Sequence, residues 1–279
     1  MENSSDDQAA AEALWRSPAT LKRAYVDYRH GQLHYRTTQP AASSKLPMLM
    51  FHQTGSSGRC YEDFVAEMGR DRIAMIVDTP SSGASDPLPK VPHIEDFADV
   101  MEEFIDRMIP GRFDLVGDHT GAMTAVEVAK RRPHQVRRVV LNASPVFVEG
   151  ETTKITFPRR SDLEGSHMFA RWKRVMSFFG HKSIPLGELE FIEGLRAGPF
   201  MHHGPHAVFS YPLKDNLPKV TQRMLVLRAQ DDLWVQTDRA RPFLCNAEMI
   251  DLPQYGREML MANYREVAAI VRPFLDQPE

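Results

Sequence analysis

Short apolar runs alternate with amphipathic segments along most of this chain. The apolar or alternating runs have the length and the aliphatic content of strands, and the segments between them repeat their apolar positions at helical spacing. The runs predict strands at 22–28, 32–37, 46–51, 72–77, 113–116, 136–142, 224–227 and 248–252. The amphipathic segments predict helices at 59–68, 94–108, 120–132, 166–179, 186–196, 206–211, 237–244 and 264–275.

This alternation predicts an α/β fold with a mostly parallel sheet and helices on both of its faces. The first two strands are separated by Arg29-His30-Gly31, which predicts an antiparallel hairpin. The alternation stops at about residue 146 and resumes at about 218. We therefore expect a flexible leader at 1–20, a core formed by 21–145 and 218–279, and an inserted helical lid at 146–217.

The segment Gly117-Asp118-His119-Thr120-Gly121 stands between a predicted strand and a predicted helix. It has the layout of a G-x-S-x-G nucleophile elbow, a sharp turn that raises one side chain above the edge of a sheet. The glycines suit a tight turn in which the helix packs close to the strand. The raised residue is His119 rather than a serine.

The order of these features resembles the α/β-hydrolase fold from about residue 21 to 276. Five motifs carry the resemblance: the loop 51–55 after the third strand, the loop 78–86 after the fourth, the elbow 117–121, the segment 225–232 and the loop 252–257. The resemblance implies that Asp232 stands at the position of the triad acid and Arg257 at that of the triad histidine.

The residues at these positions do not fit the family's usual mechanism. In that mechanism a serine attacks a carbonyl, a histidine removes its proton and an acid orients the histidine. Here the positions hold His119, Arg257 and Asp232, and a guanidinium stays protonated near neutral pH. Another chemistry, or ligand binding alone, is therefore indicated.

Each substituted position admits more than one role. His119 can act as a general base or a nitrogen nucleophile, or it can be a structural or ligand-orienting residue. Asp232 and Arg257 can form an ion pair in the pocket that keeps His119 neutral, or Arg257 can bind a substrate carboxylate. The remaining alternative is an ordinary surface salt bridge.

The resemblance also implies an oxyanion site, formed by the backbone N–H groups of Gln53 and Thr120. His52 either lines the pocket or packs under its loop. Asp118 either contacts a pocket group or is a hydrogen-bonded turn carboxylate. We list these four residues as expected oxyanion or substrate-binding positions.

Composition limits the classes of partner. The chain has 279 residues and a net charge of −3, and it contains no long basic block, which argues against a nucleic-acid surface. No signal peptide or membrane-length apolar run is visible, and Cys60 and Cys245 are isolated, so we expect a cytoplasmic protein with reduced thiols. The histidines at 202, 203 and 206 have no interleaved metal-ligand spacing. We expect no cofactor and no metal; a homodimer stays open.

The sequence therefore predicts a small-molecule enzyme with a non-serine site. The expected reaction is hydrolysis of an ester, a lactone or a C–C bond in a carbonyl compound. The alternatives are a cofactor-independent lyase or isomerase that uses His119 as general base, and a non-catalytic ligand-binding homologue. The fold does not choose among them.

Overall fold

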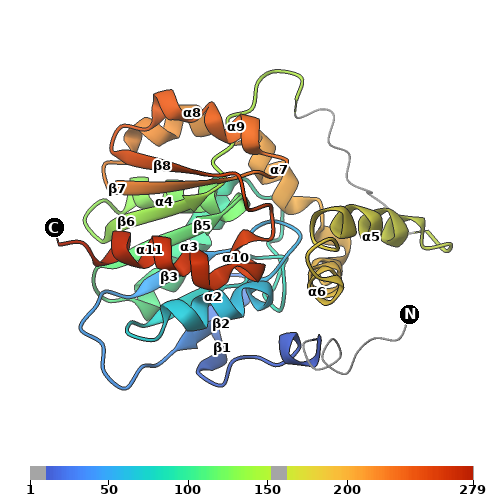
Figure 1. Cartoon of the computed structure of the whole chain (residues 1–279), viewed down its shortest axis with the longest axis horizontal. Helices are drawn as coiled ribbons and strands as arrows, with labels where there is room; N and C mark the ends of the chain where they lie inside the picture. The colour runs from blue at the N-terminus through green and yellow to red at the C-terminus, as the bar shows by residue number, and fades with distance from the viewer. Residues whose placement is uncertain (1–10, 152–161, 279) are drawn as a thin grey trace.

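The computed structural model describes residues 11–151 and 162–278. One sheet runs through the molecule in the order β1-β2-β4-β3-β5-β6-β7-β8 (Figure 1). Its strands are β1 (Leu21–Tyr28), β2 (Gly31–Thr38), β3 (Met48–Phe51), β4 (Ala74–Val77), β5 (Phe113–Asp118), β6 (Val136–Asn142), β7 (Arg223–Ala229) and β8 (Ala247–Leu252). Each of the predicted strands is confirmed, with ends that move by a few residues.

Strand directions follow from the connections. β1 and β2 form the predicted hairpin and pair antiparallel, as β2 does with β4. All other neighbours are parallel, because a helix or a longer segment returns the chain between them. The carboxyl ends of β3, β5, β6 and β7 therefore meet at one edge of the sheet, where such folds place their sites.

Helices cover both faces of the sheet, as predicted. α3 (Ile94–Met108), α4 (Thr120–Arg131) and α8 (Leu213–Asn216) pack on one face, and α2 (Glu62–Met68), α10 (Met259–Ala262) and α11 (Tyr264–Asp276) pack on the other. The predicted helix at 59–68 begins as the 3-10 turn η1 (Gly58–Tyr61). The predicted helix at 237–244 is instead α9 (Trp234–Asp238) and η5 (Arg241–Phe243), because Pro242 cannot continue a hydrogen-bonded α-helix.

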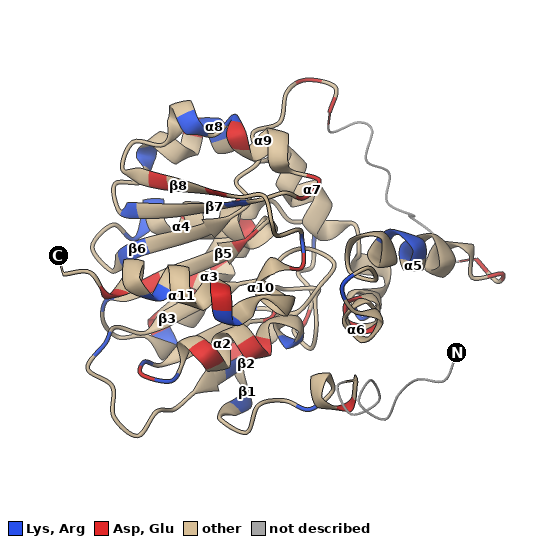
Figure 2. Ribbon diagram, viewed as in Figure 1, with Lys and Arg blue, Asp and Glu red and all other residues tan. Residues whose placement is uncertain are grey.

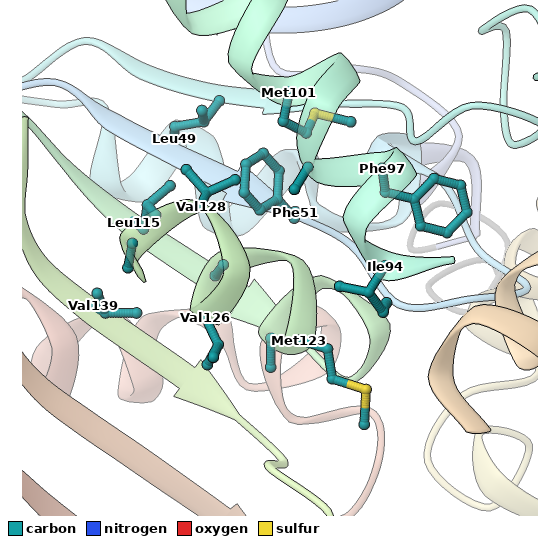
Figure 3. Close-up of a cluster of buried hydrophobic side chains, with 14 of the residues drawn as sticks. Leu49, Phe51, Ile94, Phe97, Met101, Leu115, Met123, Val126, Val128 and Val139 are labelled. Atoms are coloured by element: carbon teal, nitrogen blue, oxygen red, sulfur yellow. The ribbon is translucent and has the colours of Figure 1, made fainter. Parts of the chain in front are cut away.

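A closely packed core lies beneath α3 and α4. Figure 3 shows Phe51 of β3, Leu115 of β5 and Val139 of β6 directed toward Met101 of α3 and Val126 of α4. All five side chains are fully buried. Burying a side chain of this size contributes roughly 1.5–3 kcal/mol, so the strands that end at the elbow are held on a well-packed base.

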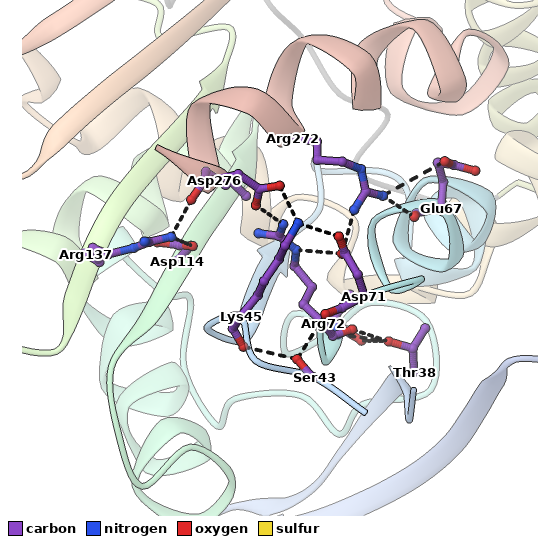
Figure 4. A network of polar contacts seen from close by, with 12 residues as sticks. Thr38, Ser43, Lys45, Glu67, Asp71, Arg72, Asp114, Arg137, Arg272 and Asp276 are labelled. Atoms are coloured by element: carbon purple, nitrogen blue, oxygen red, sulfur yellow. Dashed lines mark hydrogen bonds and ion pairs between the residues drawn. The ribbon is translucent and has the colours of Figure 1, made fainter. Parts of the chain in front are cut away.

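A polar network closes the opposite edge of the sheet (Figure 4). Arg72, which is fully buried, binds Asp276 at the end of α11, and Lys45 bridges Asp276 and Asp71. Arg272 reaches Asp71 from α11 at 2.6 Å. These contacts tie the C-terminal helix to the loops that precede β3 and β4.

The inserted region consists of short helices that stand beyond the carboxyl ends of the strands (Figure 1). They are α5 (Ser166–Phe178), α6 (Ile184–Leu195), η3 (Gly198–Phe200) and α7 (His203–Ser210), followed by η4 (Leu217–Lys219) after α8. In the expected leader, residues 11–14 are helical. Residues 1–10 of the expected leader lie outside the described residues.

Candidate functional site

The turn between β5 and α4 has the geometry of a nucleophile elbow. His119 lies between the two elements with φ 50° and ψ −107°. Residues other than glycine rarely adopt this backbone conformation. A Cβ at Gly121 would lie 2.1 Å from the carbonyl oxygen of Phe51, and one at Gly117 would lie 2.4 Å from that of Gly121. Gly121 therefore allows α4 to approach β3 closely, and Gly117 allows it to approach β5.

His119 is paired with a carboxylate from the loop after β7. Its Nε2 lies 2.9 Å from Oδ2 of Asp231, and Asp231 Oδ1 accepts a hydrogen bond of 2.8 Å from the backbone N–H of Leu233. Within residues 11–151 and 162–278, Nδ1 of His119 has no hydrogen-bond partner, although Asp118 Oδ1 stands 3.6 Å away. We call this pair the His119–Asp231 dyad.

Burial shifts the two groups of the dyad in opposite directions. Burial, then the charge of Arg257, lowers the pKa of His119 to about 3. Burial raises the pKa of Asp231 to about 7, against the opposing effect of Arg257. Both shifts disfavour the charged form, as expected for groups removed from water. Because the two groups share a hydrogen bond, their titration belongs to the pair.

Asp232 and Arg257 lie together, as the sequence suggested. Arg257 Nη1 donates a hydrogen bond of 2.6 Å to Oδ1 of Asp232, and Arg174 of α5 stands 3.6 Å from Oδ2. The guanidinium carbons of Arg257 and Arg174 lie 5.2 Å and 5.4 Å from the centre of the Phe178 ring. The ring thus sits against both cations.

Asp118 faces away from the cavity described below. Tyr61 donates a hydrogen bond of 2.5 Å to its Oδ2, and Asn142 donates one of 2.7 Å to its Oδ1. Burial raises the pKa of Asp118 to about 6 in spite of these bonds, which act in the opposite direction. Its contacts are those of a hydrogen-bonded carboxylate beneath His119.

His52 and Gln53 are committed to hydrogen bonds within the protein. The ring nitrogens of His52 contact the carbonyl of Gln53 and the backbone N–H of Thr79 at 2.7 Å and 2.9 Å. The Gln53 amide donates to Glu190 at 3.1 Å. The backbone N–H of Thr120 opens α4, and the first N–H groups of a helix have no intrahelical acceptor.

Two residues of the inserted helices hold the loop after β3, and no sequence pattern pointed to either of them. Glu190 of α6 accepts hydrogen bonds from Gln53 and, at 2.7 Å, from Ser56. Arg171 of α5 donates to the carbonyl of Gly55 at 2.7 Å. Glu190 is more than 130 positions from Gln53 and Ser56 in the chain, so no local sequence pattern could have predicted their contact.

A cavity of about 260 Å³ lies between the elbow and the inserted helices. The core contributes Thr54, Gly55, His119, Thr120, Asp232 and Arg257 to its lining, and the inserted helices contribute Arg171, Arg174 and Glu190. Its other walls are mostly apolar: Met123, Pro145, Phe147, Ala170, Val175, Phe178, Phe179, Met201, Pro205, Val208, Phe209 and Leu233. A cavity of this size and character suits a small, partly apolar molecule.

One group of side chains could hold a metal ion. His119, Asp231 and Asp232 offer ligand atoms that all lie within 4.8 Å of one another. A cation there would compete with Arg257 for Asp232.

The histidines predicted for the lid have other contacts: His203 lies 3.0 Å from the Ser81 hydroxyl, and His202 stacks edge-on against His203.

Comparison with known proteins identifies the fold. The chain is similar to the enol-lactonase of Burkholderia xenovorans LB400, with a TM-score of 0.77 and 18% identity over 91% of this chain and 100% of that one. It is also similar to a thermophilic esterase of Thermogutta terrifontis, with a TM-score of 0.74 and 16% identity over 91% and 98% of the two chains. The predicted α/β-hydrolase fold is thereby confirmed.

Sequence similarity is weaker and partial. The chain is 27% identical to a biotin biosynthesis bifunctional protein of Teredinibacter turnerae over 134 residues, which are 46% of this chain and 21% of that protein. The chain spans less than half the length of either curated relative that it matches. No family model matches it. Over the described ranges, no helix combines the length and apolarity needed to cross a membrane.

Proposed function

We propose that this protein hydrolyses small esters or lactones and that the His119–Asp231 dyad activates water in place of a serine nucleophile. The observation that carries the proposal is the 2.9 Å contact between His119 Nε2 and Asp231 at the elbow. A carboxylate that accepts one N–H of an imidazole leaves the other nitrogen as a base, which is the logic of the hydrolase triad. The esterase and lactonase activities of proteins with this fold agree with the reaction class.

The proposed reaction balances without a cofactor. Once movement of the surrounding side chains admits a water molecule from the cavity to Nδ1 of His119, this nitrogen takes a proton from the water, and the resulting hydroxide attacks the ester carbonyl. The negative charge that forms on the carbonyl oxygen is placed against the backbone N–H groups of Gln53 and Thr120. The C–O bond to the leaving group then breaks, and the leaving oxygen takes the proton from Nδ1.

The test is turnover in the presence of a serine-directed inhibitor. Wild-type protein would be assayed against 4-nitrophenyl esters and aryl lactones before and after treatment with a fluorophosphonate. We expect turnover to persist and the intact mass to stay unchanged, because the proposed mechanism forms no serine ester. A fluorophosphonate adduct that abolishes turnover would contradict the proposal.

The rate should rise with pH through about 7. Below that value Asp231 is protonated and donates to Nε2, so the imidazole proton occupies Nδ1 and the base is lost. Above it, Asp231 is ionised and accepts the Nε2 proton, which frees Nδ1. A kcat profile from pH 5 to 9 should show a single ascending limb; a rate that is flat or falls over this range would exclude the dyad as base.

A second function, ligand binding without turnover, is favoured by one observation. Nδ1 of His119 is enclosed by protein and lies 3.6 Å from Asp118 Oδ1, so water in the cavity does not contact it in this conformation, whereas ligand binding needs no such contact. If the wild type hydrolyses none of the esters or lactones, while calorimetry detects a small molecule in the cavity, the binding function replaces the catalytic one.

A further inference from the structure

We infer that the cavity selects small molecules that join an apolar body to a carboxylate, and that Arg257 and Arg174 bind the carboxylate. The inference deepens the proposed function and, for the substrate class, rests on it. The binding preference itself does not depend on turnover. Three features of the described residues carry it: unused donors, an excess of positive charge and an apolar wall.

The guanidiniums of Arg257 and Arg174 have N–H donors that form no hydrogen bond in the described part of the chain. Arg257 uses Nη1 for Asp232, and no other hydrogen bond from its guanidinium occurs in the described part of the chain. Arg174 reaches Asp232 only at 3.6 Å. A guanidinium has five N–H donors arranged to meet a planar carboxylate. Both groups can therefore bind a carboxylate while Asp232 stays in place.

Phe178 contacts both cations. Both guanidiniums contact the ring of this residue at the end of α5, and both line the cavity. Arg257 is largely enclosed, with 17% of its side chain exposed, whereas 54% of the Arg174 side chain is exposed. A ligand would thus meet one buried cation and one at the mouth of the cavity.

The charges that line the cavity do not cancel. Three guanidiniums, those of Arg171, Arg174 and Arg257, face two carboxylates, those of Glu190 and Asp232. Arg171 is bound to backbone carbonyls of Gly55 and Glu190. Among the described lining residues, Asp232 is the carboxylate that forms ion pairs with Arg174 and Arg257. Figure 2 shows that basic residues gather on α5, whose sequence contains no acidic residue. An anionic ligand would remove this imbalance while Asp231, whose charge also acts on Arg257, is protonated.

Binding of the carboxylate also acts on the dyad. Burial is the main cause of the lowered pKa of His119, and the charge of Arg257 is the next. A carboxylate that pairs with Arg257 offsets that charge, so it raises the pKa of His119 and strengthens the imidazole as a base. The same carboxylate also raises the pKa of Asp231, which Arg257 lowers, so the ionised dyad forms at a higher pH.

Two matched pairs of small molecules test the inference. For turnover, 4-nitrophenyl hydrogen glutarate is compared with methyl 4-nitrophenyl glutarate, which has the same chain without the charge. For binding, calorimetry compares 4-phenylbutanoate with 4-phenylbutanamide, using wild type and His119→Gln. We expect at least a tenfold preference for the charged member in each pair, smaller at 1 M NaCl because salt screens the exposed cation.

Variants assign the preference to the two arginines. Arg174→Gln and Arg257→Gln should each reduce the preference at least threefold, whereas Arg70→Gln, which removes a surface ion pair with Glu67, should leave it unchanged. Equal binding of acid and amide by folded wild type, or an unchanged preference in both cavity variants, would overturn the inference. If the acid is preferred but no ester is hydrolysed, the inference stands and the proposed catalysis fails.

Discussion

Replacing Asp231 with asparagine is expected to reduce kcat for an ester substrate by about 10²- to 10⁴-fold, the usual contribution of a general base. Asp231→Asn can still accept the Leu233 N–H through its oxygen, so its amide nitrogen turns toward His119. The amide then donates to Nε2, and the imidazole proton is forced onto Nδ1. The fold is kept while the base is lost, because only the tautomer changes.

The measurement is steady-state hydrolysis at pH 8, with circular dichroism to verify folding. Asp106→Asn is the matched control, since Asp106 is an exposed carboxylate that pairs with Arg132 far from the dyad. His119→Gln should lose as much activity as Asp231→Asn, and the double variant should lose little more, because the two groups act as a unit. An Asp231→Asn variant within threefold of wild type would contradict the dyad.

Replacing Gly121 with alanine is expected to lower the free energy of unfolding by at least about 3 kcal/mol, the upper range for an overpacked core. The new Cβ would lie 2.1 Å from the Phe51 carbonyl oxygen and 2.9 Å from that of His52. Both obstacles are backbone atoms of a buried strand end, which cannot turn aside as a flexible side chain can. α4 would have to move away from β3 and take the elbow with it.

Urea unfolding of Gly121→Ala beside Gly111→Ala measures this effect. A Cβ at Gly111 meets nothing within 4 Å, so that variant should stay within about 0.5 kcal/mol of wild type. Equal midpoints for the two variants would show that the elbow can accommodate a methyl group. We also expect Gly121→Ala to lose activity under conditions in which it remains folded, because the backbone that positions His119 is displaced.

The fold could be predicted from the sequence because its signals are local. The continuous apolar run at Met48–Phe51 marks a strand buried on both faces, and the helix Ile94–Met108 was predicted to the residue from its apolar spacing and the proline that follows. The elbow was recognisable because two glycines flank one raised residue. Each of these features depends on neighbours within a few positions.

The partner of His119 was not predicted, because two adjacent carboxylates follow β7. The resemblance pointed to Asp232, and that residue does pair with Arg257. Its neighbour Asp231 turns toward the elbow instead, since its backbone and the Leu233 N–H fix the side chain in that direction. The backbone path of the loop after β7 determines which of the two carboxylates reaches His119. Glu190 was missed for a related reason, since its contacts join distant parts of the chain.

Because the pKa shifts of His119 and Asp231 are opposite, their effects on the pH dependence of folding stability nearly cancel. The lowered pKa of His119 alone would reduce stability as pH falls from 6.5 toward 3, because the unfolded imidazole binds the proton first. The raised pKa of Asp231 alone would reduce stability as pH rises from 3.8 toward 7, because the folded carboxyl holds its proton longer. Where the two pH ranges overlap, the folded and the unfolded protein each bind one proton at this pair. The proton is on the Asp231 carboxyl in the folded protein and on the His119 imidazole in the unfolded protein. Folding thus transfers a proton within the pair, and the site can titrate near neutrality without unfolding the protein.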